Sequence, residues 1–388
     1  MQSKRIGGLI EHFQILTDPR VDRTREHELI DVLIIGLCCI ICGGDSFNDM
    51  EHFGRAKLEW FKTFLKLPNG IPSHDTFNRV FSALDPQKFL QSFLSWTQSV
   101  RAAIPQEIVA LDGKALRRAI DAGAAPRCIV SAWAEDNGLV LGQWEVDQKS
   151  NEITAIPQIL RALELSGCIV TLDAMGCQKK IAREIKEADA DYVLALKGNQ
   201  GTVHDEVKTF LHQTLAEKKK PRAKAAPVPK AAAALEEFET IEKDHGRIET
   251  RRYWLSAELD WFQDKPDWEG LRTVGMVEAV REINGHTTVE RRYYLSSLGL
   301  NVKAFARAVR GHWGIENKLH WMMDVVFGED QSRARSGHAA HNLATLRRLA
   351  LNLLKREKKK RSVRGKQLDA GWDNAYLLKV IGVEPSDI

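Results

Sequence analysis

In the stretch CIVTLDAMGCQKK (residues 168–180), an apolar run typical of a buried strand ends in a carboxylate, and a helical pattern follows. A charge at the end of a buried strand costs free energy unless a partner neutralises it, so Asp173 is a candidate functional residue. The stretch IVALDGKALRR repeats the pattern, with Asp112 at the end of an apolar run. Carboxylates on the ends of neighbouring strands can converge at one sheet edge, where Mg²⁺ would bridge them.

Phosphoryl chemistry that uses two such ions usually needs a third carboxylate. The segment RGHWGIENKLHWMMDVVFGED offers four candidates: Glu316, Asp324, Glu329 and Asp330. At about 100° per residue, one apolar stripe of a helix would hold Ile315, Leu319, Met322 and Val326. Glu316 lies at the edge of this stripe, whereas Asp324 lies further round and the last two acids follow Gly328, beyond the helix. Glu316 is therefore the best placed to reach a sheet edge.

The composition is that of a globular protein, with 28% charged and 44% hydrophobic residues in a chain of 388. The net charge of +4 is unevenly spread, because residues 355–366 hold eight basic side chains and one acidic side chain. Such a run indicates a polyanion contact or a solvated tail. The most apolar run, residues 32–42, is too short to span a bilayer, and the first residues lack a secretory signal. We expect a reduced, cytoplasmic protein with no membrane contact.

The chain divides by its sequence patterns into four parts. Residues 1–103 are expected to form a helical N-terminal domain. From about residue 107 the predicted element order is β-β-β-α-β-α-β-α, which describes a mixed α/β sheet flanked by helices over residues 104–217. Residues 218–300 are expected to hold a low-complexity linker and a β-rich insertion. Residues 301–388 return to helix and end in the basic segment.

Seven ordered motifs resemble the H-repeat-associated DDE transposases of bacterial insertion sequences. The similarity covers nearly the whole chain, and its motifs are LDGKALR, KSNEITAIPQIL, TLDAMGCQKKIA, ALKGNQG, HGRIETR, RYYLSS and HWGIENKLHWMMDVVFGED. The resemblance implies a ribonuclease-H-like core in which Asp112, Asp173 and Glu316 are the catalytic residues and bind two Mg²⁺ ions, for which Mn²⁺ can substitute. It also implies cleavage of DNA at the element's ends, strand transfer into target DNA, and a homodimer on DNA.

Several polar residues near these carboxylates are candidate DNA contacts. The related transposase group carries a Tyr-Arg-Glu-Lys pattern, whose Tyr, Arg and Lys positions are here Val309, His312 and Met323, so other side chains would contact the DNA ends. The candidates are Lys114, Arg117, Arg118, Lys197, Asn199, Gln200, Arg310, His312, Trp313, Asn317, Lys318 and His320, with Lys358, Lys359, Lys360 and Arg361 in the basic segment. Phosphate contacts of this kind make binding depend steeply on salt.

Two rival interpretations remain. An Asp-Gly at a strand end also occurs in aspartyl-phosphate phosphatases, but these usually carry a second Asp two residues later, where this chain has Lys114. The other alternative is a catalytically inactive or domesticated DNA-binding relative. The three carboxylates argue against the loss of metal binding, and an assay of Mg²⁺-dependent nicking would separate an enzyme from a DNA-binding protein.

Overall fold

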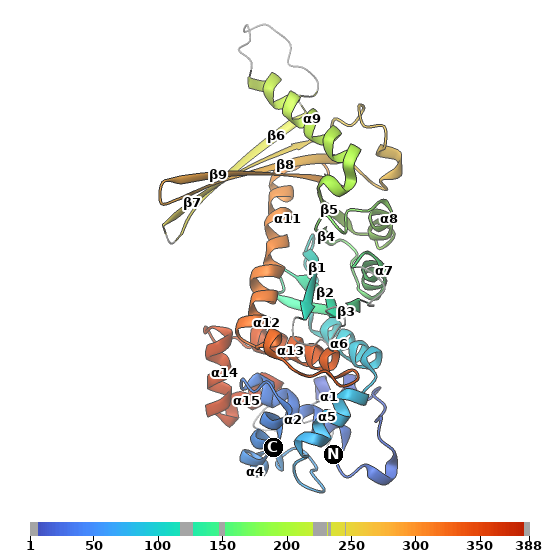
Figure 1. Cartoon of the computed structure of the whole chain (residues 1–388), viewed down its shortest axis with the longest axis vertical. Helices are drawn as coiled ribbons and strands as arrows, with labels where there is room; N and C mark the ends of the chain where they lie inside the picture. The colour runs from blue at the N-terminus through green and yellow to red at the C-terminus, as the bar shows by residue number, and fades with distance from the viewer. Residues whose placement is uncertain are drawn as a thin grey trace. The chain divides into compact units, whose positions relative to one another are not determined.

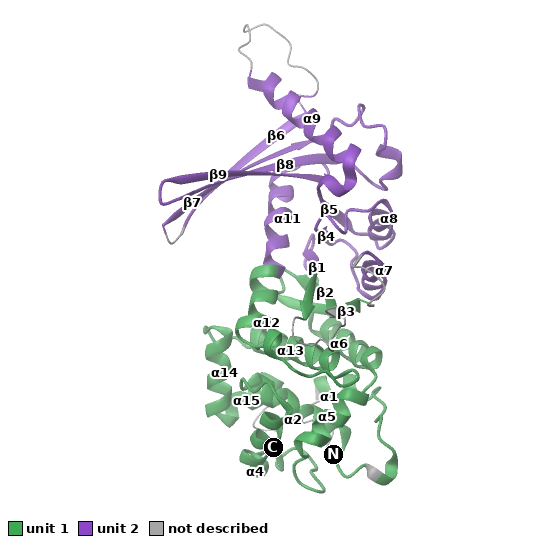
Figure 2. Ribbon diagram, viewed as in Figure 1, with its two compact units in different colours: residues 1–103, 113–151, 316–388 green, residues 104–112, 152–315 purple. Residues whose placement is uncertain are grey.

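The computed structural model describes residues 7–116, 127–146, 152–219, 231, 234–244 and 246–383. The chain forms two compact units (Figure 2). Unit 1 comprises residues 1–103, 113–151 and 316–388, and unit 2 comprises residues 104–112 and 152–315.

Unit 1 is mainly helical. Its helices are α1 (Gly7–Phe13), α2 (Leu29–Ile41), α3 (Phe47–Ala56), α4 (Leu58–Phe61), α5 (His74–Ala83), α6 (Pro86–Val100), α12 (Trp321–Val325), α13 (Ala339–Arg356), α14 (Val363–Trp372) and α15 (Asn374–Ile381). Short helical turns are η1 (Asp22–Thr24), η4 (Glu316–His320) and η5 (Glu329–Gln331). The unit also contains the hairpin strands β2 (Arg127–Ala134) and β3 (Leu139–Val146).

Helix α13 lies at the centre of unit 1 and contacts α2, α5, α6, α14, α15 and β3. Its residues Ala339–Leu354 are all buried, and so is almost every side chain of α2. The apolar run at residues 32–42 is therefore a core helix, as its length predicts. Ser73 is the N-cap of α5, a position that serine favours, and its side chain accepts a hydrogen bond from the Thr76 amide.

Unit 2 contains the remaining strands and the helices that accompany them (Figure 1). The strands are β4 (Ile169–Leu172), β5 (Asp191–Leu196), β6 (Leu235–Asp244), β7 (Arg247–Ser256), β8 (Thr273–Ile283) and β9 (His286–Ser296). The helices are α7 (Glu152–Ala162), α8 (Lys179–Glu187), α9 (Gly201–Lys219) and α11 (Val302–Ile315), with the turns η2 (Gly198–Gln200) and η3 (Lys265–Asp267). Strand β1 (Ile108–Leu116) begins in unit 2 and ends in unit 1.

The strands form one mixed sheet of nine in the order β3-β2-β1-β4-β5-β9-β8-β7-β6. Strands β1, β4 and β5 pair in parallel, and β2–β3 and β5–β9 pair antiparallel. The expected order β-β-β-α-β-α-β-α is the order found from β1 to α9, which confirms the mixed α/β fold. Strands β6 to β9 continue this sheet through β9, because β9 pairs with β5. The low-complexity linker, expected at residues 218–234, falls largely outside the described residues. The four domain boundaries remain a prediction.

Helix α11 packs on the sheet of unit 2 through an apolar core. Phe305 is fully buried among side chains of β4, β5, β7, β8 and β9, and its ring meets Tyr294 edge-on at 5.4 Å. Gly275 permits this approach, because a Cβ at that position would lie 2.6 Å from the Phe305 ring. The core therefore fixes where α11 runs along the sheet.

Replacing Phe305 with Ala should lower the free energy of unfolding by about 3–5 kcal/mol, because the change leaves a cavity under α11. The control is Ile241→Ala, since the Ile241 side chain is 60% exposed and should cost little. Denaturant unfolding followed by circular dichroism measures both changes. Equal stability of the two variants would show that α11 is not held by this core.

Candidate active site at the ends of strands β1 and β4

Asp112 and Asp173 follow directly after paired residues of two parallel strands. In the β1–β4 ladder, Leu111 is the partner of Leu172. Each aspartate is the next residue along its strand, and the carboxyl ends of parallel strands meet at the same sheet edge. The structure therefore places both aspartates at the same level of the sheet, on neighbouring strands.

The loop after Asp173 is held by hydrogen bonds at both ends. The Oδ1 atom of Asp173 accepts hydrogen bonds from the backbone amides of Met175 (3.0 Å) and Gly176 (3.4 Å). The side-chain amide of Asn199 donates to the Ala174 carbonyl at 2.6 Å, and that of Gln200 donates to the Cys177 carbonyl at 2.7 Å. Asn199 and Gln200, which we predicted as DNA contacts, thus fix the loop that carries Asp173.

Helix α11 runs alongside β1 and β4 in the same direction as these strands. Near its middle, the Arg307 guanidinium donates to the Gln106 carbonyl at 3.0 Å, just before β1 begins. One turn later, a Cβ on Gly311 would lie 2.7 Å from the Ile108 side chain. His312 Nδ1 lies 3.1 Å from the Thr171 hydroxyl, two residues before Asp173. Successive turns of α11 therefore meet successive levels of the sheet.

The helical segment changes its geometry at the predicted third carboxylate. Residues Glu316–His320 form the π-helix η4, which follows α11 directly. Single π-helical turns are rare and are frequently found at functional sites. Within this turn His320 Nδ1 lies 3.0 Å from Glu316 Oε2, so the ring orients the carboxylate. Glu316 is 58% exposed, whereas His320 is buried, which does not fit the prediction that His320 contacts DNA.

The π-helical turn also corrects the predicted apolar stripe. The buried residues of this segment include Ile315, Leu319 and Met323, whereas Met322 is only half-buried. The prediction of Met322 was wrong because it assumed a regular α-helix, and a π-helical turn holds one residue more than an α-helical turn. Glu329 and Asp330 do follow Gly328, beyond α12, as predicted.

Lys114 belongs to a buried charge network in unit 1. Its ammonium group contacts the carboxylate of Asp324 and lies 3.0 Å from that of Glu329 and 3.7 Å from that of Asp330. Arg348 is fully buried and donates to Glu329 Oε1 at 2.6 Å. The Lys114 residue is only 9% exposed, so the prediction of a phosphate contact at this position does not fit the structure.

The network explains the pKa values of its acids. Burial raises the pKa of Asp324 above its ordinary value, although Lys114 acts to lower it. Burial also acts to raise the pKa of Glu329, but the positive charges of Arg348 and Lys114 outweigh it and lower this pKa to about 2. Lys114 and Arg348 thus keep Glu329 ionised. Because these ion pairs occupy its carboxylate, Glu329 is a poor candidate for a metal ligand.

Sequence reasoning missed this role of Lys114, although a signal was present. Side chains two residues apart lie on the same face of a strand, so Asp112, Lys114 and Leu116 share one face of β1. Leu116 is buried, and a lysine beside it needs acidic partners. The acids of the segment after Glu316 supply them.

The other predicted DNA contacts differ in their surroundings. Lys197 and Asn317 are exposed. Arg310 pairs with Glu242 at 2.9 Å, Lys318 pairs with Glu135, and the guanidinium of Arg292 stacks on the Trp313 ring at 4.4 Å. Arg117 and Arg118 lie outside the described residues.

The basic segment 355–366 is folded, which corrects the prediction of a tail. It includes the end of α13 and the start of α14. Lys359 and Arg361 both pair with Asp369 at 2.8 Å, whereas Lys358 and Lys360 are exposed. The two exposed lysines remain candidates for a phosphate contact.

The side chains of the site carry donors that suit a divalent cation. Asp112, Glu316 and His320 each offer an oxygen or a ring nitrogen to a metal ion. Asp173 does not belong to this group, and its Oδ1 atom accepts hydrogen bonds from the loop amides. Carboxylate oxygens are the donors that Mg²⁺ and Mn²⁺ prefer, whereas imidazole suits Zn²⁺ and other transition metals better.

Comparisons with known proteins show the family to which the chain belongs. The Transposase DDE domain family matches residues 105–353, and a domain described as DDE_Tnp_1-associated matches residues 10–97. The chain belongs to the DDE transposase family. This family implies use of a divalent metal ion and binding to DNA. The match confirms the resemblance drawn from the motifs and supports the ribonuclease-H-like fold class.

Relatives cover nearly the whole chain. The protein named "Putative transposase YncI" of Escherichia coli O157:H7 is 37% identical over 97% of this chain and 95% of its own length. The protein named "H repeat-associated putative transposase YhhI" of Escherichia coli K12 is 38% identical over 96% of this chain and 97% of its own length. Among solved structures, piggyBac transposase in its synaptic complex with hairpin DNA is similar over 99% of this chain and 79% of its own, at 11% identity and a TM-score of 0.43.

Replacing Lys114 with Met should lower the free energy of unfolding by about 3 kcal/mol, because the change leaves Asp324 without its buried positive partner and leaves Arg348 as the remaining partner of Glu329. Adding Asp324→Asn should recover part of this loss, since it removes one of the unbalanced carboxylates. Lys318→Met is the control, because this lysine is half-exposed and its ion pair is worth less than about 1 kcal/mol. A double variant no more stable than Lys114→Met would contradict the network.

Proposed function

We propose that the chain is a DDE transposase that cleaves DNA at the ends of an insertion sequence and joins them to target DNA. Asp112, Asp173 and Glu316 would bind two Mg²⁺ ions. The observation that carries the proposal is the parallel β1–β4 register, which sets Asp112 and Asp173 at the same level on neighbouring strands. A charge at the end of a buried strand costs free energy unless a partner neutralises it, and here two such ends coincide.

The course of α11 supports Glu316 as the third ligand. His312 lies beside Thr171, and Asp173 is two residues, or about 6.6 Å, further along β4. Glu316 is four residues after His312, and four helical residues rise by about 6 Å. The helix and the strand run in the same direction, so Glu316 follows α11 at the height where Asp173 follows β4.

The residues of the chain have distinct tasks in this proposal. When bound, the cations would activate a water molecule and stabilise the leaving oxygen of the phosphodiester. Asp173 is held in position by the amides of Met175 and Gly176, and the Glu316 carboxylate is oriented by His320. Water attacks the phosphodiester at the end of the element and frees a 3′-hydroxyl, which then attacks target DNA without a covalent bond to the protein.

The proposal includes partners and a location. The partners are the element ends and target DNA, and we expect a homodimer on DNA because two ends must be joined. Bacterial DNA lies in the cytoplasm, so we propose that the protein acts there. None of the described helices is both long and apolar enough to cross a membrane.

The alternative is a relative that binds DNA without cleaving it. A plasmid that carries the terminal repeats flanking the gene separates the two functions. An active enzyme nicks the supercoiled plasmid when Mg²⁺ is present and leaves it intact in EDTA. Binding without nicking in either Mg²⁺ or Mn²⁺ would favour the inactive relative.

Replacing Asp173 with Asn should reduce cleavage by more than 10²–10³-fold, because losing electrostatic stabilisation of about 3–4 kcal/mol already costs that much. Binding to end DNA at equal salt should stay within several-fold. The control is Asp205→Asn, which neutralises an exposed aspartate on α9 and should leave both quantities unchanged. Equal losses of binding and cleavage would indicate a structural role for Asp173, and full activity would exclude the metal-ligand role.

Replacing Lys358 and Lys360 with Ala should weaken binding to all DNA sequences similarly and reduce the salt slope, since phosphate contacts carry no sequence information. Replacing Lys359 and Arg361 with Ala should instead lower thermal stability, because both residues are bound to Asp369. Binding titrations over a series of salt concentrations measure the first effect. An unchanged slope in Lys358→Ala/Lys360→Ala would mean that these lysines are only solvated.

A further inference from the structure

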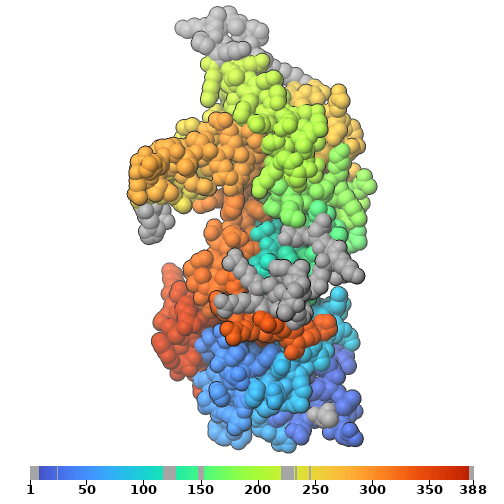
Figure 3. Space-filling view, in the orientation of Figure 1, coloured from blue at the N-terminus to red at the C-terminus, as the bar shows by residue number. Residues whose placement is uncertain are grey.

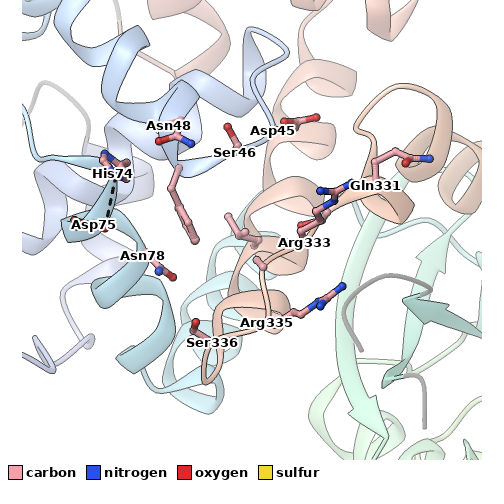
Figure 4. Close-up of a pocket in the computed structure, with 14 residues that line it drawn as sticks. Asp45, Ser46, Asn48, His74, Asp75, Asn78, Gln331, Arg333, Arg335 and Ser336 are labelled. Carbon is pink, nitrogen blue, oxygen red and sulfur yellow. Dashed lines mark ion pairs between the residues drawn. The ribbon is translucent and has the colours of Figure 1, made fainter. Parts of the chain in front are cut away.

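Unit 1 contains a cavity of about 460 Å³. Its lining includes none of the predicted catalytic, metal-binding or DNA-binding residues. One wall is formed by the N-terminal ends of α3 and α5, with Asn48, His74 and Asn78 (Figure 4). The opposite wall is residues 331–336, which we call the strap, and it includes Gln331, Arg333 and Arg335. The volume lies within the range of about 300–1,000 Å³ that is typical of ligand-binding pockets.

The strap lies across the N-terminal helices on the face shown in Figure 3 and is fixed at both ends. Before the strap, Glu329 is bound by Lys114 and Arg348 in the buried charge network. After it, the His338 amide donates to the Ser82 carbonyl at 3.0 Å. Gly337 allows this contact, because its φ is +50° and a Cβ there would lie 2.5 Å from the Ser82 carbonyl oxygen. The cavity is therefore preformed by segments anchored on both sides.

The floor of the cavity is apolar, and a buried arginine holds its rim. Phe47 and Leu343 supply its apolar surface, and Phe47 packs on Phe81 with ring centroids 5.9 Å apart. The guanidinium of Arg347 is buried and reaches the carbonyl of Asp45, which lines the rim, at 3.4 Å. An apolar floor bounded by fixed polar groups accepts a flat or amphipathic group better than a simple ion.

The polar groups of the walls match the chemistry of a nucleotide. Arg333 is exposed at the rim and supplies a planar guanidinium, which suits a phosphate oxygen pair. The side-chain amides of Asn48 and Asn78 can each donate and accept, as the edge of a nucleobase requires. Asp45 and Asp75 would repel a phosphate, but they can accept hydrogen bonds from base amino groups. Acids, amides and a guanidinium together suit bases with their phosphate rather than a bare anion.

We propose that this cavity binds a segment of the DNA substrate, with a backbone phosphate at Arg333 and base edges at Asn48 and Asn78. The inference rests on the proposed function and adds a DNA-binding site in unit 1 that is separate from the metal-binding carboxylates. Because the strap begins two residues after Glu329, the network that binds Glu329 also restricts the position of Arg333. Occupation of the cavity would thus fix the register of DNA on the protein.

The test uses the full-length protein in EDTA, where cleavage is blocked, and two fluorescent duplexes, one with the terminal repeat that flanks the gene and one with a scrambled sequence. Arg333→Gln should reduce the slope of log binding constant against log salt by about 0.7–0.9, the contribution of one phosphate contact. Asn78→Ala should leave the slope unchanged and lower the preference for the repeat by roughly tenfold.

The control is Arg79→Gln, which removes the same charge from α5 at a residue that does not line the cavity. It should keep the wild-type slope and preference. The proposal is overturned if Arg333→Gln and Asn78→Ala both behave as wild type, or if Arg79→Gln loses as much as Arg333→Gln. Failure of wild-type protein to nick the plasmid in Mg²⁺, with the binding losses intact, would reject the transposase activity but not the DNA site.

Discussion

The parallel pairing of β1 with β4 is the constraint on which the candidate site depends. Its register joins Leu111 to Leu172, so two acidic residues leave the sheet together. Neither aspartate could be moved by one residue without turning its side chain to the other face of the sheet. The hydrogen bonds from Asn199 and Gln200 then fix the loop after β4, and the Phe305 core fixes the helix that leads to Glu316.

Strand β1 carries a negative charge at Asp112 and a positive charge at Lys114, and the two side chains have different surroundings. Asp112 is half-exposed, whereas Lys114, on the same face of β1, is buried and neutralised by acids of the segment after Glu316. The acids that follow Glu316 in the chain therefore already have cationic partners from the protein. We infer that this pairing limits the number of carboxylates that can compete for a metal ion, which keeps the ligand set small.

The sequence predicted those features that depend on local patterns. The strand that ends at Leu172 follows from its apolar run, and the order of strands and helices from β1 to α9 follows from periodicity. It failed where tertiary contacts decide. The π-helical turn moved the buried position from Met322 to Met323, and the acids that neutralise Lys114 lie about two hundred residues away in the chain. The basic run resembles a tail in the sequence because Asp369, the partner of Lys359 and Arg361, comes later in the chain, within α14.

Strand β6 ends the nine-stranded sheet, so one side of it lacks a strand partner among the described residues. Exposed edges of this length are templates for aggregation, since their amides and carbonyls can pair with another chain. Its sequence LEEFETIEKD carries four glutamates, including Glu237, Glu239 and Glu242. Two such edges brought together would set carboxylates against carboxylates. The acidic side chains of β6 therefore protect the protein against edge-to-edge association.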